Sequence, residues 1–88
     1  MTGPRVSVIV PVRNRQGLLA SLLDALAEQT FRDFEVVIVD DGSTDGSREL
    51  AESERRVPIT VSRAEGGGAV AARMAGVAIA RGAVFAFT

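Results

Sequence analysis

The 88-residue chain is long enough for one small domain at most, and its 47% apolar and 24% charged residues are ordinary for a globular protein. Its net charge of −1 gives no attraction to nucleic acid, and the lack of cysteine and histidine excludes disulfides, thiolate zinc sites and Ser-His-Asp catalysis. No apolar run is long enough for a membrane span, so we expect a cytoplasmic protein, with membrane association of a longer protein left open.

The first third of the chain predicts a buried strand followed by an amphipathic helix. The β-branched run Val6–Val10 is typical of a strand, which we expect to end at Pro11. After a polar loop, leucines recur at the spacing of one helix face, which predicts a helix from Gln16 to about Gln29. The leucines of this predicted face are Leu18, Leu19, Leu22, Leu23 and Leu26.

The middle of the chain predicts a second strand and a second helix. Glu35–Asp40 is apolar through its middle, so we expect a strand that is covered on both faces. Ser43 or Thr44 would then cap a helix that runs to about Glu54, because their side-chain oxygens can accept hydrogen bonds from the first turn.

The last third of the chain predicts a strand, a helix and a final strand. Val57–Ser62 predicts the third strand, and Pro58 near its start suits an edge position. The small-residue stretch from Ala69 to about Ala80 predicts a helix that ends at Gly82, and Ala83–Phe87 predicts the fourth strand.

The order of these elements is β-α-β-α-β-α-β with short connections, which indicates an α/β fold with a doubly wound parallel sheet. Ligands of such sheets bind at the carboxyl ends of the strands, where this chain carries its polar and glycine-rich stretches. A final strand with no covering element is normally an exposed edge. We therefore expect residues 1–88 to form the first half of a larger domain, truncated after the fourth strand.

The most distinctive stretch is Asp40–Asp45, where two adjacent carboxylates end a strand and Gly42 lets the chain turn. The carboxylates can accept hydrogen bonds from ribose hydroxyls or a pyrimidine N–H. The competing interpretation is an Asx-turn with a helix cap. The stretch also approximates the spacing of a calcium loop, although a strand precedes it where a calcium loop has a helix. A phosphatase loop of the haloacid-dehalogenase kind is a further alternative, with a spacing that does not match.

Three further features lie at the same predicted edge of the sheet. Gly66–Gly68 precedes a helix, and it is either a phosphate cradle of backbone N–H groups or a flexible turn. Arg73 is either a solvated surface residue or a partner for a diphosphate. Arg13 is a candidate contact for phosphate or base, whereas Asn14 beside it is interpreted as a loop-shaping residue.

Taken together, these segments resemble the inverting family 2 glycosyltransferases, which have the GT-A fold. The resemblance runs from Arg5 to Thr88 through the opening strand with its Pro-x-x-Asn loop, the Gln-Thr turn after the first helix and the Asp-Asp-Gly-Ser stretch. The family usually has an aromatic residue where Arg13 stands and an asparagine where Met74 stands. The matching positions of the third helix and the turn after it are Gly68, Ala72, Arg73, Gly76, Ala80 and Gly82.

The resemblance implies binding of a nucleotide-sugar donor, with a UDP-sugar expected. For nucleotide binding it implies Pro11, Val12 and Arg13 in the base pocket, and Asp40 as a hydrogen-bond partner of the base. Asp41 would support the ribose or order the loop, with Gly42 beside it, and Arg73 would lie near the diphosphate or the ribose.

In this family the Asp-x-Asp metal motif follows the fourth strand, so the resemblance implies no catalytic residue and no metal ligand within residues 1–88. It implies that the full-length protein binds Mg or Mn and transfers a hexosyl group to a sugar or lipid-linked acceptor that this sequence does not identify. This portion alone would be inactive, and its partner would be the C-terminal half of the domain.

The alternatives are a non-catalytic doubly wound nucleotide-binding or interaction module, and a sugar nucleotidyltransferase. The loop after the first strand disfavours the latter, since it has one Gly and no Lys.

Overall fold

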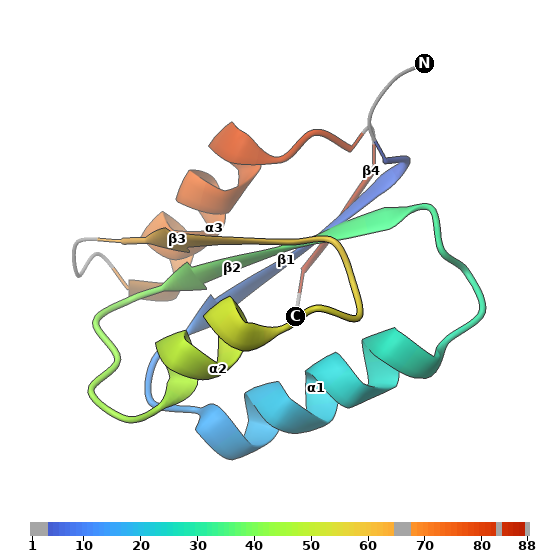
Figure 1. The fold of residues 1–88 in the computed structure, drawn as a ribbon. Coiled ribbons are helices and arrows are strands. Elements are labelled where there is room, and N and C mark those ends of the chain that lie inside the picture. Colours follow the sequence, from blue (N-terminus) through green and yellow to red (C-terminus); the bar gives the residue numbers. More distant parts are fainter. Residues whose placement is uncertain (1–3, 65–67, 83, 88) are drawn as a thin grey trace.

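The computed structural model describes residues 4–64, 68–82 and 84–87, which form an alternating α/β unit (Figure 1). The predicted elements follow in the predicted order, and only the expected strand start at Ala83 lies outside the described residues. The elements are β1 (Val6–Val12), α1 (Gln16–Glu28), β2 (Phe34–Asp40), α2 (Ser47–Ser53), β3 (Ile59–Arg63), α3 (Gly68–Ile79) and β4 (Val84–Phe87).

The strands form one parallel sheet in the order β3-β2-β1-β4. The chain steps from β1 outward to β3 and then returns to place β4 on the other side of β1. The direction of winding therefore reverses at β1, which makes the end of β1 a switch point of the sheet. The predicted doubly wound parallel sheet is confirmed, and so is the edge position of β3.

Helices cover both faces of the sheet, with α1 and α2 on one face and α3 on the other (Figure 1). β2 is buried along its whole length, as predicted for a strand covered on both faces. Because successive side chains of a strand point to opposite faces, β2 contributes to two cores. Ile38 belongs to the core beneath α1 and α2, whereas Val37 and Val39 belong to the core beneath α3.

β1 continues through Pro11 to Val12, so the predicted end of the strand at Pro11 is wrong. The carbonyl oxygen of Val12 accepts a hydrogen bond from the N–H of Asp41 at 2.8 Å. The backbone N–H and C=O groups of Val12 therefore face β2. Backbone groups alternate between the two sides of a strand, so the nitrogen of Pro11 faces the β4 side. Pairing with the described part of β4 ends at Ile9, and the missing N–H of Pro11 therefore costs no ladder bond there.

The inward face of α1 follows the predicted pattern except at its first turn. Leu18 was expected on this face, but 66% of its surface is exposed. It lies on the rim of the face and lines an apolar cavity of about 350 Å³ beside β1. Leu19 and Leu23 lie in the core, and Leu22 and Leu26 are partly buried and pack against it.

Within the described ranges no helix has the length and apolar character needed to cross a bilayer.

α2 begins at Ser47, later than the predicted start at Ser43 or Thr44. The N-cap is Gly46, which has no side chain to cap the helix, so the predicted cap is wrong. The reason lies outside the local sequence. The hydroxyl of Ser43 and the backbone N–H of Thr44 both hydrogen bond to Asn14 in the β1–α1 loop.

A buried carboxylate closes the amino-terminal end of the sheet. Glu35 is 3% exposed, and its Oε2 accepts hydrogen bonds from the hydroxyl of Ser7 and the backbone N–H of Arg81, both at 2.6 Å. The Ser7 hydroxyl in turn accepts the N–H of Gly82 at 2.8 Å. Burial acts to raise the pKa of Glu35, but the hydrogen bonds from Ser7 and Arg81 lower the pKa below its ordinary value. This network fastens the α3–β4 connection to β1 and β2.

The Glu35 network predicts an acid-sensitive contribution to stability. A carboxyl group whose pKa is lowered by folding contributes stability above its unfolded pKa of about 4.5, and the contribution is lost as pH falls through the folded pKa. Glu35→Gln is therefore expected to lower the free energy of unfolding by about 2 kcal/mol at neutral pH. The loss should shrink as the pH falls to about 3, which urea denaturation of both proteins would measure. A loss that stays constant with pH would contradict this account of Glu35.

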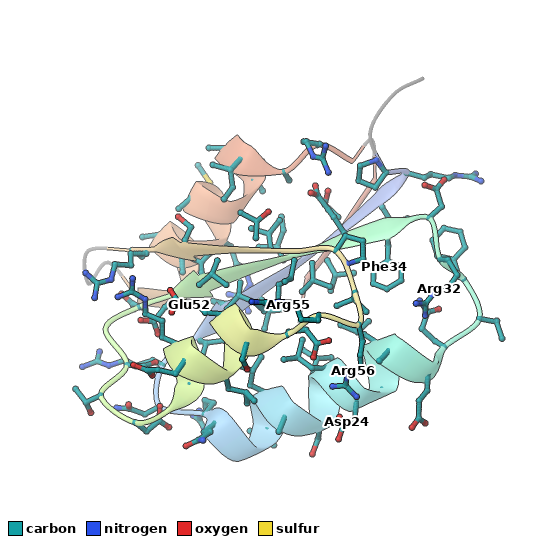
Figure 2. All side chains as sticks on the ribbon, in the orientation of Figure 1. Asp24, Arg32, Phe34, Glu52, Arg55 and Arg56 are labelled. Carbon is teal, nitrogen blue, oxygen red and sulfur yellow. The ribbon has the colours of Figure 1, made fainter. Side chains whose placement is uncertain are left out.

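Arginines near the same end join the α1–β2 and α2–β3 connections. Asp24 and Arg56 point toward one another (Figure 2), and their Oδ1 and Nη2 atoms lie 2.9 Å apart. The same Nη2 lies 2.9 Å from Oε1 of the buried Glu54. Arg32 donates hydrogen bonds to the carbonyl oxygens of Ala27 at 3.0 Å and of Arg56 at 3.4 Å. These arginines therefore hold connections together at the end of the sheet opposite to the predicted ligand site.

Candidate functional site

A cavity of about 320 Å³ opens at the carboxyl-terminal ends of β1 and β2, where a doubly wound sheet binds its ligands. Its walls come from the end of β1 and the loop after it, from the residue that follows β2, and from the first half of α3. The lining residues are Pro11, Val12, Arg13, Asp41, Gly68, Ala72 and Arg73. Most of the residues predicted to bind nucleotide are thus brought together from three separate stretches of the chain.

The other two predicted residues, Asp40 and Gly42, do not line the cavity. Asp40 is 3% exposed, and its Oδ1 accepts a hydrogen bond from the N–H of Ser43 at 3.3 Å. Gly42 has a φ of 79°, a left-handed conformation in which a side chain would be strained. Both residues shape the turn that presents Asp41.

Asp41 is the carboxylate on the cavity wall. Its backbone N–H donates to the carbonyl of Val12, so the segment after β2 is tied directly to the end of β1. Asp41 is only 6% exposed. A ligand group that reached this carboxylate would meet it in a largely desolvated setting, where hydrogen bonds to a charge are strengthened.

α3 can form the third wall because Gly76 lets it approach the sheet closely. A Cβ atom at Gly76 would lie 2.4 Å from Cγ2 of Ile9, so a larger residue would push the helix away. The close approach buries Ala72 completely and leaves Arg73 half-buried beside the cavity. The helix starts at Gly68 with a φ of 82°, which again favours glycine.

The polar groups of the cavity suit an anionic ligand that carries hydroxyl groups. Arg13 and Arg73 supply guanidinium groups, which bind phosphate bidentately, and Asp41 supplies acceptors for hydroxyl or N–H donors. Gly66 and Gly67, the first two residues of the predicted phosphate cradle, lie outside the described residues.

The described residues do not by themselves make a metal site. Over residues 4–64, 68–82 and 84–87, no three His, Cys, Asp or Glu side chains lie close enough to hold a metal ion. The divalent cation implied by the family resemblance therefore has no ligand set among them. The calcium-loop alternative for the Asp40–Asp45 stretch would use Asp45 as a metal ligand. Asp45 instead accepts hydrogen bonds from the backbone N–H of Ser47 at 2.8 Å and of Gln16 at 3.3 Å.

Asn14 joins the two loops that carry the cavity, a larger role than the loop-shaping one assigned to it from the sequence. Its Oδ1 accepts hydrogen bonds from the N–H groups of Thr44 at 2.7 Å and Asp45 at 3.1 Å. The Pro-x-x-Asn spacing of the sequence marked Asn14 as part of the family resemblance. Nothing in the local sequence indicated its partners, because they lie in the loop after the next strand.

Known proteins similar to this chain are glycosyltransferases. The family model described as glycosyl transferase family 2 matches residues 7–88. The chain is 38% identical over 86 residues to the uncharacterized glycosyltransferase EpsJ of Bacillus subtilis (strain 168), with 96% of this chain and 25% of EpsJ covered. The crystal structure of S. aureus TarS 1–349 in complex with UDP-GlcNAc is similar with a TM-score of 0.88 and 36% identity, over 96% of this chain and 26% of that one.

The structure of the mannosyltransferase PcManGT from Pyrobaculum calidifontis, in complex with GDP-Man and Mn²⁺, is similar with a TM-score of 0.63 and 37% identity. That likeness covers 83% of this chain and 24% of the mannosyltransferase. The chain thus spans about a quarter of the length of EpsJ and of TarS 1–349. The predicted GT-A fold is confirmed by the likeness to TarS. Because the family model covers nearly all of the chain and the fold agrees with it, the chain belongs to glycosyl transferase family 2.

Proposed function

We propose that this chain is the donor nucleotide-binding portion of an inverting glycosyltransferase that uses a nucleotide sugar, with a UDP-sugar as the expected donor. The observation that carries the proposal is the cavity at the strand ends, which gathers Pro11, Val12, Arg13, Asp41 and Arg73. The UDP-GlcNAc complex of the similar TarS structure supports a nucleotide-sugar ligand.

The polar residues of the cavity divide between the parts of a nucleotide. Because Asp41 rather than Asp40 lines the cavity, we assign Asp41 the contact with a ribose hydroxyl or base N–H, and Asp40 the support of its loop. Arg13 and Arg73 would neutralise the diphosphate, since guanidinium groups pair with phosphate oxygens in a fork geometry. Pro11 and Val12 would provide the apolar wall for the base.

The complete protein would transfer a hexosyl group to a sugar or lipid-linked acceptor. Inverting transfer requires a base for the acceptor hydroxyl and stabilisation of the leaving diphosphate. We propose that residues outside 1–88 supply the base and the ligands of a Mg or Mn ion. The Mn²⁺ complex of the similar mannosyltransferase and the quarter-length span of the chain support this division. Residues 1–88 alone would then bind nucleotide weakly and catalyse no transfer, so transfer activity of this portion would contradict the division.

Calorimetric titration of the complete protein with UDP in the presence of Mn²⁺ tests the proposal, with GDP as the comparison nucleotide. We expect saturable binding of UDP that is tighter than binding of GDP. A folded protein that binds neither nucleotide would contradict the proposal and favour the alternative, a non-catalytic interaction module in which the strand-end carboxylates only order their loops.

A further inference from the structure

The loop after β1 and the loop after β2 are joined through one side chain. The Oδ1 atom of Asn14 accepts the backbone N–H groups of Thr44 and Asp45, and it lies 3.4 Å from the hydroxyl of Thr44. In the opposite direction, the backbone N–H of Asn14 donates to the hydroxyl of Ser43 at 3.0 Å. Asn14 therefore contacts three consecutive residues of the other loop.

The backbone of Asn14 adopts a conformation that few residue types tolerate. Its φ is 52°, and it is the non-glycine residue with a positive φ among the described residues. Asparagine and aspartate enter this left-handed region more readily than other residues with side chains, because their short polar groups can hydrogen bond locally. The turn at Asn14 directs its side chain across the gap between the loops.

Three more hydrogen bonds run beside Asn14 between the same two loops. The N–H of Arg15 donates to the hydroxyl of the fully buried Ser47 at 3.1 Å. Gln16 and the segment Asp45–Gly46 exchange a pair of bonds at 3.3 Å, one in each direction. We call the contacts of residues 14–16 with residues 43–47 the loop clamp.

The loop clamp lies next to the cavity without lining it. Arg13, on one wall, immediately precedes Asn14. Asp41, on another wall, precedes Ser43, whose N–H also donates to Asp40. The distance between Arg13 and Asp41 therefore depends on the loop clamp, whose contacts begin one residue after Arg13 and two residues after Asp41.

We propose that Asn14 is a positioning residue for the donor site, which sets the spacing between Arg13 and Asp41 through the loop clamp. The inference rests on the proposed function, since it assigns Asn14 to the nucleotide site of that function. Asn14 does not touch the ligand. It acts by holding two ligand-binding loops in one arrangement before the nucleotide arrives, which lowers the cost of ordering them on binding.

The test compares two substitutions at Asn14 in the complete protein, with the dissociation constant for UDP measured by calorimetry. Asn14→Gly keeps the left-handed backbone accessible but removes Oδ1, and it is expected to weaken UDP binding about tenfold. Asn14→Asp keeps an acceptor oxygen and tolerates the same backbone, so it should bind UDP within about threefold of the wild type. Because both variants allow the same backbone conformation, a difference between their UDP dissociation constants reports the effect of the acceptor oxygen.

A matched control lies at the other end of the sheet. Asp33 Oδ1 accepts the N–H of Arg5 at 3.2 Å in an exposed loop, so Asp33→Ala also removes a side-chain acceptor from a backbone donor. It should leave the UDP dissociation constant unchanged. Urea denaturation of each variant confirms that the binding data come from folded protein.

Each outcome decides between the two proposals. Equal UDP affinity of the wild type and Asn14→Gly would overturn the positioning role alone, whereas no UDP binding by the wild type would overturn the proposed function and the positioning role with it. If Asn14→Gly does not fold, Ser43→Ala takes its place, because it removes only the acceptor of the Asn14 N–H. A loss of about threefold is then expected, and unchanged affinity would overturn the inference.

Discussion

Gly82→Ala is expected to destabilise the fold by about 3 kcal/mol, although it adds a single methyl group. A Cβ atom at Gly82 would lie 2.6 Å from Oγ and 2.7 Å from the backbone nitrogen of Ser7, and 2.9 Å from the carbonyl carbon of Val6. Two of these atoms are backbone atoms of β1 and cannot rotate away. The connection would have to shift, which breaks the bond from the Gly82 N–H to Ser7 and leaves Glu35 with weaker donors.

Urea denaturation measures this effect, and Gly17→Ala is its matched control. A Cβ atom at Gly17 meets no other atom within 4 Å, and Gly17 lies in the first turn of α1. Alanine there should be neutral or stabilise the protein by up to about 1 kcal/mol, because glycine is a poor helix former. If Gly82→Ala proved as stable as the wild type, α3 and β4 could not be connected as described.

Asp41→Ala is expected to weaken UDP binding roughly thirtyfold, about 2 kcal/mol, the usual worth of a hydrogen bond to a charged group. Among the predicted carboxylates, Asp41 is the one on the cavity wall, and its burial limits competition from water. The N–H that ties this residue to Val12 belongs to the backbone, so the substitution retains that link. Calorimetric titration of the complete protein with UDP measures the change.

Asp33→Ala serves as the control for charge, since it removes the same negative charge from an exposed loop at the opposite end of the sheet. Its UDP affinity should match that of the wild type. An Asp41→Ala protein that is folded and binds UDP as tightly as the Asp33→Ala protein would exclude Asp41 from the donor site.

The elements with strong periodicity could be predicted from the sequence almost to their ends. Continuous β-branched runs marked β1 and β2, and the leucine spacing marked α1, because burial selects residues at the period of each structure. The errors occur where a distant contact replaces a local one. Ser43 and Thr44 looked like helix caps, but their polar groups bond to a loop 29 and 30 residues away.

Polar residues inside the sheet are a second case in which distant contacts could not be predicted from the local sequence. Glu35 begins a predicted strand, and its charged side chain is buried. Its partners Ser7 and Arg81 lie 28 and 46 residues away, so no local pattern could pair them. The cavity could be predicted because strand-end topology gathers distant loops at one edge. The sequence did not indicate whether Asp40 or Asp41 lines the cavity, because this depends on the path of the backbone through the turn at Gly42.

Residues from both hydrophobic cores line the cavity. Val12 belongs to the core beneath α1 and α2, Ala72 belongs to the core beneath α3, and both line the cavity. A bound nucleotide would therefore contact residues of both hydrophobic cores at once. By mass action, a ligand at a hundredfold excess over its dissociation constant adds about 2.7 kcal/mol to the stability of the state that binds it. Under the proposed function, saturation with nucleotide would therefore stabilise the packing of α3 on the sheet.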